Sequence, residues 1–324
     1  MIFDAHGDIW TDVTVKRLKG QKNIIKNDHL KKFQAGKIKG GIFVIWVDPP
    51  YDSDPQKRTL EIIASMAVEI NENQDIIHII RNVDDIEKAL KDDKFAVIIG
   101  LEGLNSIGKN IEFIDVLYMF GARHASLTWN EENDLATGVR GNPERGLTDL
   151  GCQAVKKIEQ LGMILDVSHA NEKSFWGIYE AAAKPIIASH SNCKFLCDVP
   201  RNLTDEQLKA VASTGGVVGL NAFKDFVHPM LEKQDIEHLA NHLDHMVEVM
   251  GIDHVGFGFD YCDFLEGDTM NSFAQGEDVG TIGLEDASKT QNIIKILKKR
   301  GYRQADIDKI SCQNFFRIIK EIIR

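Results

Sequence analysis

The chain has 324 residues, a formal net charge of −11 at pH 7, 43% hydrophobic residues and 27% charged residues. This balance excludes intrinsic disorder as the main state, because disordered chains combine low hydrophobicity with high net charge. The acidic charge and the lack of any Lys/Arg-rich block argue against a nucleic-acid-binding protein, which needs a basic surface to meet phosphates.

Short apolar runs recur along the chain, separated by amphipathic segments. The runs are often β-branched and are apolar at successive residues rather than at alternate ones, which is typical of strands buried on both faces. In chain order they cover residues 2–6, 41–47, 95–101, 125–129, 163–167, 185–189, 216–220 and 254–259. The sequence therefore predicts eight buried strands.

The segments between these runs have helical periodicity. Residues 60–70 and 236–250 carry apolar side chains at spacings of three and four. Thr204 and Gln207 have the spacing of a capping box, which predicts that a helix begins there. The terminal stretch 284–324 is predicted to add two or three helices.

Eight buried strands that alternate with helices predict an α/β fold, a (β/α)8 TIM-type barrel with extra C-terminal helices. The length suits one such barrel with insertions, and no Pro- or Ser-rich linker interrupts it, so we expect a single domain over residues 1–324. A doubly wound open sheet is the structural alternative. Its Gly-rich fingerprint is missing, because no helix start follows Gly256 and Gly258.

Polar side chains gather at the ends of the predicted strands, where the catalytic residues of such a barrel lie. Three histidines and three carboxylates are expected to project toward one mouth: His6, Asp8, Glu102, His169, His190 and Asp260. Imidazole nitrogens and carboxylate oxygens together suit Zn²⁺ or a similar divalent ion. A single histidine at a strand end is more often hydrogen-bonded than metal-bound, so the prediction depends on the whole group.

The number of ligands indicates two ions. His6 and Asp8 are two residues apart, so both side chains point to the same face of a strand. With Glu102, His169 and His190 they make five ligands, more than one tetrahedral ion with an open position needs. Glu102 is the natural bridge, because a carboxylate has two oxygens. A two-ion centre about 3.5–4 Å across ionises a bridging water and polarises a carbonyl, so we expect hydrolysis.

Short motifs follow one another in order from residue 1 to about residue 320. They read DAHGD at 4–8, GLEG at 100–103, GLTDLG at 146–151, LGMILDVSH at 161–169, PIIASHS at 185–191, PRNLTD at 200–205 and GLEDASK at 283–289. Together they resemble the motifs of the renal (membrane) dipeptidase family of zinc peptidases. The resemblance implies an amidohydrolase-like barrel with a two-zinc site, in which His6 and Asp8 bind one ion, His169 and His190 bind the other, and Glu102 bridges them.

The same resemblance implies roles for two further residues. Asp260 matches the aspartate that moves a proton between the nucleophilic water and the leaving amine. Glu102, as the bridge between the ions, is the other expected catalytic residue. Arg201 matches the arginine that holds the terminal carboxylate of the substrate, a task that suits a planar bidentate donor. A homodimer is also implied by the family.

Two departures from the family pattern leave questions open. Where the family often has a histidine that stabilises the oxyanion, this chain has Trp129, whose indole N–H can donate one hydrogen bond but cannot carry a charge. Trp129 is expected to donate to substrate, to wall the pocket or to shift selectivity, and Asn130 is a candidate substitute donor. The exit of the last strand also differs, so the roles of Asp263 and of the acidic loop 265–283 stay open.

The leading hypothesis is a zinc-dependent dipeptidase in which a metal-bridging hydroxide hydrolyses small dipeptides, L,L and L,D. One alternative keeps the metals but acts on another small amide, a shift that Trp129 would mark. The other is a catalytically weak homologue with a binding role, against which the complete ligand set argues. The expected cofactors are two divalent ions, zinc in the first place, and the expected partner is a small dipeptide.

The compartment is inferred from leader and cysteine patterns. Residues 1–6 have no basic or apolar region of a signal peptide, and no apolar run approaches the roughly 20 residues needed to span a bilayer. The five cysteines are odd in number and widely spaced, which suits free thiols in a reducing compartment. We therefore expect a cytoplasmic protein with no membrane partner.

Overall fold

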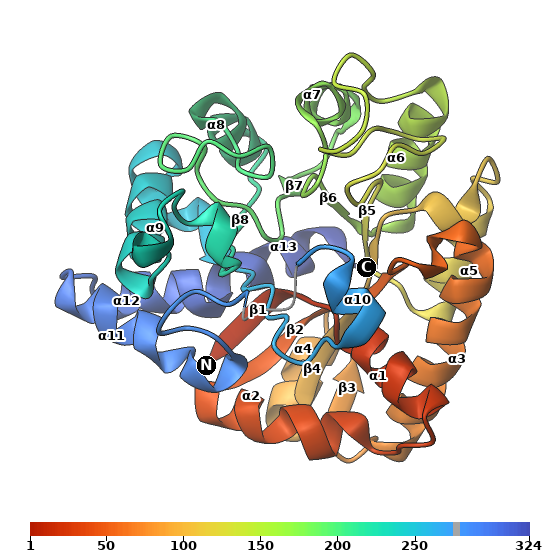
Figure 1. Ribbon diagram of the computed structural model, residues 1–324, viewed down its shortest axis with the longest axis horizontal. Coiled ribbons are helices and arrows are strands. Elements are labelled where there is room, and N and C mark those ends of the chain that lie inside the picture. The colour runs from red at the N-terminus through yellow and green to blue at the C-terminus, as the bar shows by residue number, and fades with distance from the viewer. Residues whose placement is uncertain (275–278) are drawn as a thin grey trace.

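The computed structural model describes residues 1–274 and 279–324 (Figure 1). Its parallel strands form two sheets, with the orders β3-β4-β2-β1-β9-β8 and β5-β6-β7. The strands are β1 (Ile2–Gly7), β2 (Ile38–Trp46), β3 (Ile77–Ile79), β4 (Phe95–Glu102), β5 (His124–Ser126), β6 (Ile164–Asp166), β7 (Ile186–Ile187), β8 (Val218–Leu220) and β9 (Val255–Phe257). Each predicted strand is found, so the predicted α/β class is confirmed.

Two single parallel bridges connect the sheets into one ring. Ile99 pairs with Ala122 just before β5, and Ala188, just after β7, pairs with Val218. The order is then β1, β2, β4, β5, β6, β7, β8, β9 and back to β1. Sequence analysis missed β3. This strand pairs with the first residues of β4, and Ala122 pairs with the same edge of β4 further along the strand. Its three residues are too short a run to be recognised by periodicity.

Helices lie outside the strands (Figure 1). They are α1 (Ile9–Leu18), α2 (Leu30–Gly36), α3 (Pro55–Glu72), α4 (Asp85–Lys91), α5 (Phe113–Phe120), α6 (Asp149–Leu161), α7 (Glu172–Ala181), α8 (Asp205–Ser213), α9 (Ile236–Met250), α10 (Gly267–Asn271), α11 (Gln291–Lys299), α12 (Gln304–Asp308) and α13 (Asn314–Ile322). Both bonds of the predicted capping box form, from Gln207 N to Thr204 Oγ1 and from Thr204 N to Gln207 Oε1. None of the helices in residues 1–274 and 279–324 is long and apolar enough to cross a bilayer.

The last helix packs against the beginning of the barrel. The ring of Phe315 in α13 lies 6.0 Å from the ring of Phe3 in β1. Both belong to a buried cluster with Ile42 of β2 and Ile98 of β4, which are also buried. These side chains fill the space among the strands next to α13. The carboxyl ends of the strands form the site. The single-domain organisation over residues 1–324 stays a prediction.

Candidate active site

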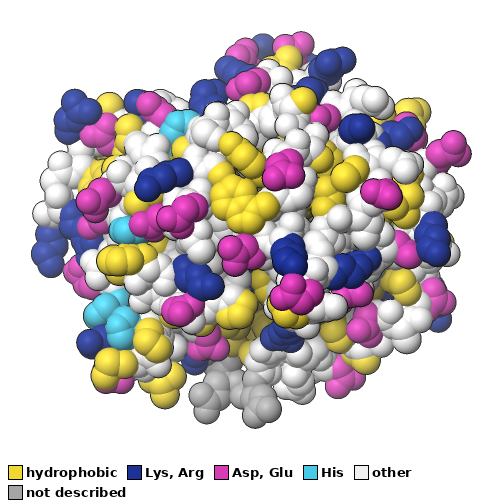
Figure 2. Space-filling model, turned by 90° about the horizontal axis from the view of Figure 1, so that it is seen from above, with side chains coloured by type: hydrophobic (Ala, Val, Ile, Leu, Met, Phe, Trp, Pro, Cys, Tyr) yellow, Lys and Arg dark blue, Asp and Glu magenta, His cyan; other side chains and the backbone are white. Residues whose placement is uncertain are grey.

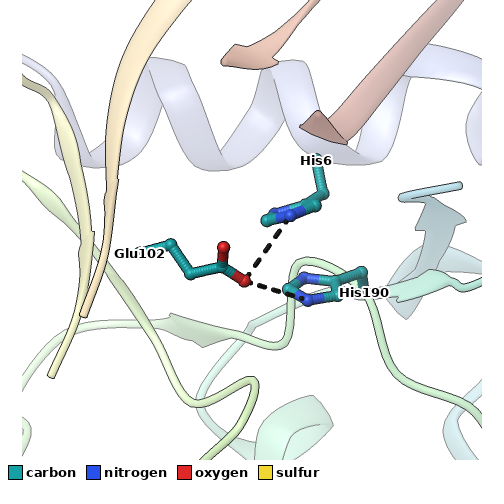
Figure 3. A group of neighbouring side chains, drawn as sticks. All are labelled: His6, Glu102 and His190. Atoms are coloured by element: carbon teal, nitrogen blue, oxygen red, sulfur yellow. Dashed lines mark ion pairs between the residues drawn. The ribbon is translucent and has the colours of Figure 1, made fainter. Parts of the chain in front are cut away.

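The predicted polar residues meet at the carboxyl ends of the strands. Oε1 of Glu102, the last residue of β4, lies 2.9 Å from Nε2 of His169, 3.5 Å from Nε2 of His190 and 3.6 Å from Nε2 of His6. Figure 3 shows His6 and His190 pointing at the Glu102 carboxylate from two other parts of the ring. One carboxylate oxygen therefore faces three imidazole nitrogens.

A second group of ligand atoms shares His6. Its Nε2 lies 3.7 Å from Oδ2 of Asp8 and 3.8 Å from Oδ1 of Asp260. Asp8 is no longer on the strand that carries His6, because it occupies the N-cap position of α1. The predicted proximity of the two side chains is found, although the strand alternation expected for them ends at Gly7.

The local chemistry fits divalent cations. Nδ1 of His6 and Oδ1 of Asp8 are buried and have no hydrogen-bond partner among the described residues. Nε2 of His169 and Nε2 of His190 lie only 2.9 Å apart, beside the same oxygen of Glu102. Buried polar atoms without partners and converging lone pairs are costly unless a cation lies between them. The donor set, imidazole nitrogen with carboxylate oxygen, is one that Zn²⁺ and similar ions use.

The protonation equilibria support this fit. Burial, together with the charges of Arg201 and His6, lowers the pKa of His169 and of His190 well below the usual value, so both rings are neutral and can donate a lone pair. Burial raises the pKa of Glu102 well above its usual value. Burial also lowers the pKa of His6, but Glu102 and Asp8 outweigh this and raise it to about 10. Glu102 and Asp8 therefore favour a positive charge next to Nε2 of His6, and a metal ion bound there would replace the ring proton.

A relay behind the site orients His190. Its Nδ1 lies 2.7 Å from Oγ of Ser189, and that hydroxyl donates to Oδ2 of Asp166 at 2.5 Å. His124 Nε2 lies 2.9 Å from the same oxygen of Asp166. Since the Ser189 proton goes to Asp166, its oxygen accepts from Nδ1–H of His190, and Nε2 is left free to bind a metal. His124 thus has a structural partner in Asp166.

His169 and Asp260 have strained backbones. Their φ angles are 68° and 58°, in the left-handed region that residues other than glycine rarely adopt. Such conformations cost about 1–3 kcal/mol and persist where the surroundings hold them. The Nδ1 of His169 lies 2.8 Å from Oδ1 of Asn130, and Nδ2 of Asn221 donates to Oδ2 of Asp260 at 3.0 Å. Both side chains are thereby directed toward Glu102 and His6.

A cavity of about 240 Å³ opens beside these residues. It is lined by most of the predicted site residues: Asp8, Glu102, Trp129, Asn130, His169, Arg201 and Asp260. Arg201 is buried, its Nη2 donates to the backbone oxygen of His190 at 3.1 Å, and its Nε has no partner in the described part of the chain. Burial lowers the pKa of Arg201, although the site carboxylates oppose this.

Trp129 lies in the turn after β5, because the strand ends at Ser126 rather than at residue 129. Its ring is half-buried and lies 6.1 Å from the ring of His169. Asn130 also lines the cavity, but its Oδ1 is engaged by His169, and the predicted donation to substrate stays a prediction. Asp263 pairs with Lys32 on the surface and does not line this cavity. Of the loop 265–283, residues 275–278 lie outside the described residues.

Sequence analysis missed the aromatic lining of the cavity. Trp46, Phe223, Phe226 and Phe273 all contribute to it. Trp46 is the next-to-last residue of the second predicted strand and Phe223 follows the seventh, so the strand-end rule could have found both. Nothing local in the sequence marks Phe226 or Phe273.

Figure 2 shows the charge pattern on one face of the molecule, and the expected absence of a nucleic-acid partner stays a prediction. On the face in Figure 2, Lys and Arg side chains are interspersed with Asp and Glu, and no continuous basic area is seen. A groove that follows a phosphate backbone needs such an area.

Comparisons with known proteins identify the family of the chain. The model of the membrane dipeptidase family, peptidase family M19, matches residues 1–324. The chain is 32% identical over 247 residues to the "Uncharacterized protein in pqqA 5'region" of Klebsiella pneumoniae, which covers 74% of this chain and 86% of that protein. It is 30% identical over 234 residues to an "Uncharacterized dipeptidase" of Schizosaccharomyces pombe, which covers 70% of this chain and 53% of that protein.

A solved structure shows the same fold. A metallopeptidase from Rhodobacter sphaeroides, liganded with a phosphinate mimic of the dipeptide L-Ala-D-Ala, superposes with a TM-score of 0.85 at 23% identity over 99% of both chains. The resemblance drawn from the sequence motifs is thus confirmed, and with it the use of divalent metal. The chain belongs to the membrane dipeptidase family, peptidase family M19, and is a hydrolase of the metallo-dipeptidase class.

Proposed function

We propose that this protein binds two zinc ions and hydrolyses small dipeptides, of both L,L and L,D configuration. The observation that carries the proposal is the convergence of the three imidazole nitrogens of His6, His169 and His190 on one oxygen of Glu102, at 2.9–3.6 Å. When bound, two divalent ions supply an ionised water and polarise the scissile carbonyl. The L,D configuration is supported by the L-Ala-D-Ala mimic in the Rhodobacter sphaeroides relative.

The ligand assignment is the one that the family resemblance implies, and the closeness of these side chains around His6 and Glu102 supports it. His6 and Asp8 would hold one ion, and His169 and His190 would hold the other. Glu102 would bind both, because its carboxylate has two oxygens and its Oε1 lies within 3.6 Å of a ring nitrogen of each of the three histidines. Neutral His169 and His190 suit this role, since a protonated ring has no lone pair to give.

Asp260 would move the proton. Its Oδ1 lies 3.8 Å from Nε2 of His6, and its Oδ2 accepts from Asn221, so the carboxylate faces the metal ligands from the cavity wall. Its side chain is 14% exposed, which leaves it within reach of a substrate. The carboxylate would accept a proton from the attacking water and deliver it to the nitrogen of the leaving amine as the C–N bond breaks.

Arg201 would hold the terminal carboxylate of the dipeptide. The guanidinium is buried in the cavity wall, and its Nε is free to donate. A planar guanidinium matches a carboxylate with two parallel hydrogen bonds. Because Arg201 also contacts the backbone of His190, it lies a short distance from the reacting centre, which restricts substrates to short ones.

The compartment and the assembly are also proposals. The five cysteines are free thiols, and four of them are buried, which supports a reducing compartment such as the cytoplasm. The homodimer implied by the family stays a prediction.

The test is the metal content per chain, measured by elemental analysis on the same sample that is assayed against L,L and L,D dipeptides. About two zinc ions with turnover support the proposal. Two zinc ions without turnover favour another small amide as substrate, because Trp129 stands where the family often has a histidine. Little or no metal after reconstitution with zinc contradicts the proposal.

A further inference from the structure

Five aromatic rings form a continuous arc along one wall of the active-site cavity: Trp129, Trp46, Phe273, Phe223 and Phe226. Successive ring centroids are 5.1, 5.8, 6.2 and 4.8 Å apart in that order. These are the separations at which aromatic side chains contact one another. We call this wall the aromatic arc.

The aromatic arc is assembled from distant parts of the chain. Trp46 ends β2, Trp129 follows β5, Phe223 and Phe226 follow β8, and Phe273 follows α10. No single run of apolar residues along the chain would bring these five rings together, because they belong to four separate segments. The wall therefore presents a wide apolar surface to whatever occupies the cavity.

The α10 segment, which carries the middle ring Phe273, is held in place by a buried ion pair. Thr269 of α10 donates from Oγ1 to Oδ2 of Asp48 at 2.6 Å. Asp48 is fully buried and is held by Arg58, whose Nε and Nη2 donate to its two oxygens at 2.7 and 3.1 Å. Phe273 is thus attached to the end of β2, close to Trp46.

The two ends of the arc are chemically different. Phe226 lies under Arg201, whose guanidinium carbon is 5.4 Å from the ring centroid. At the other end, Trp46 lies opposite Glu102 in the register of β2 and β4, and Trp129 contacts Trp46. A dipeptide whose carboxylate is held by Arg201 therefore places its N-terminal residue toward Trp46 and Trp129.

The Trp46 end also carries an unpartnered donor. Trp46 is 2% exposed, and its Nε1 has no hydrogen-bond partner in residues 1–274 and 279–324. A buried N–H without an acceptor is costly, and an acceptor on a bound molecule recovers that cost. Trp129, Phe226 and Phe273 are only half-buried and leave apolar surface open to the cavity.

We infer that the Trp46 and Trp129 end of the aromatic arc is the subsite for the side chain of the N-terminal residue, and that it selects dipeptides in which this residue is aromatic or large and apolar. The inference rests on the proposed function, because Arg201 must mark the C-terminal end of the substrate. Trp129 stands where the family often has a histidine. In the arc it adds a large apolar surface next to Trp46.

The first experiment compares two series of dipeptides on the zinc-loaded protein. In the series Xaa-Ala, with Xaa as Gly, Ala, Leu, Phe and Trp, kcat/KM rises by about tenfold or more from Ala to Phe, because the arc buries the added apolar area. In the series Ala-Xaa the change is smaller. Flat values in the Xaa-Ala series, or a steeper rise in the Ala-Xaa series, overturn the inference.

Variants test the arc itself. Trp129→Ala lowers the ratio of kcat/KM for Phe-Ala over Ala-Ala by about tenfold. The matched control is Phe195→Ala, because Phe195 is 73% exposed, stacks on His245 and does not line the cavity. This control leaves the ratio unchanged. An equal effect of the two substitutions on the ratio contradicts the assignment.

A binding measurement separates this inference from the proposed function. The metal-free protein, kept in chelator so that no turnover occurs, is titrated with Phe-Ala and with Ala-Ala while tryptophan fluorescence is recorded. Phe-Ala changes the emission at lower concentration than Ala-Ala, because Trp46 and Trp129 lie in the subsite. Equal responses overturn the arc even where dipeptides are cleaved, whereas a Phe-Ala response without any turnover after zinc loading contradicts the hydrolysis alone.

Discussion

The hydroxyl oxygen of Ser189 lies 2.7 Å from Nδ1 of the adjacent His190 and connects that ring to the buried carboxylate of Asp166. Histidines that bind metals commonly donate a hydrogen bond from their other ring N–H to such an outer partner. The partner fixes both the tautomer and the ring orientation. The sequence pair Ser-His at 189–190 therefore joins a predicted metal ligand to the residue that orients it.

Replacing Ser189 tests this relay. Ser189→Ala removes the acceptor for Nδ1–H of His190, so we expect zinc affinity to fall by about 10–100-fold. Competition of zinc with a chromophoric chelator measures the change. The control is Ser213→Ala, because the Ser213 hydroxyl donates to a backbone carbonyl in α8, far from the site. Unchanged affinity in Ser189→Ala would show that His190 is oriented without the relay.

Glu102 is expected to serve both ions. Glu102→Gln keeps the shape of the side chain but removes its charge, so the zinc content falls to less than one per chain, and activity drops by more than the ~10–100-fold that outer partners contribute. Elemental analysis and dipeptide assays check both outcomes. Glu144→Gln is the control, since Glu144 is an exposed partner of Lys173. Two ions per chain with full activity in Glu102→Gln would remove the bridging role.

Arg201 is expected to act on binding. Arg201→Met removes charge-assisted hydrogen bonds worth about 1.5–3 kcal/mol, so KM for dipeptides rises by about 10–100-fold with a smaller change in kcat. The comparison substrate is the same dipeptide with a C-terminal amide, on which the variant and the wild type should differ much less. An equal loss on both substrates would contradict carboxylate recognition, and Arg201→Lys should restore only part of the affinity because it lacks the planar fork.

The stability of the relay should depend on pH. Burial raises the pKa of Asp166, but His124, Ser189 and backbone N–H groups outweigh this and lower it from 3.8 to about 2. A carboxyl whose pKa is lower in the folded than in the unfolded protein stabilises the fold above its unfolded pKa. Asp166 thus contributes about 2 kcal/mol above pH ~4, which is lost as the pH falls toward about 2.

Chemical denaturation of the wild type and of Asp166→Asn measures this contribution. The difference in their free energies of unfolding should be largest near pH 6 and should shrink as the pH is lowered below ~4. In Asp198→Asn, which removes the exposed partner of Lys194, the difference from wild type should stay small throughout. A difference for Asp166→Asn that does not change with pH would mean that the carboxylate is not anionic in the relay.

Local pattern was enough to predict every strand except β3, and the gathering of the polar residues. Strands buried on both faces are apolar at successive residues, so each run was visible without any knowledge of its neighbours. Because the carboxyl ends of parallel strands meet at one mouth, His6, Glu102 and Asp260 could be expected to lie together although they are far apart in the chain. The capping box at Thr204 was likewise visible, because its two hydrogen bonds join residues three apart.

Other features depended on non-local contacts. The irregular backbone after β5, the left-handed turns at His169 and Asp260, and the engagement of Asn130 by His169 have no periodic signal. The same holds for the aromatic arc, whose rings come from four segments. Sequence periodicity reports which face of one element is buried. Only the packing of elements against each other decides which rings share a wall and which single oxygen three histidines face.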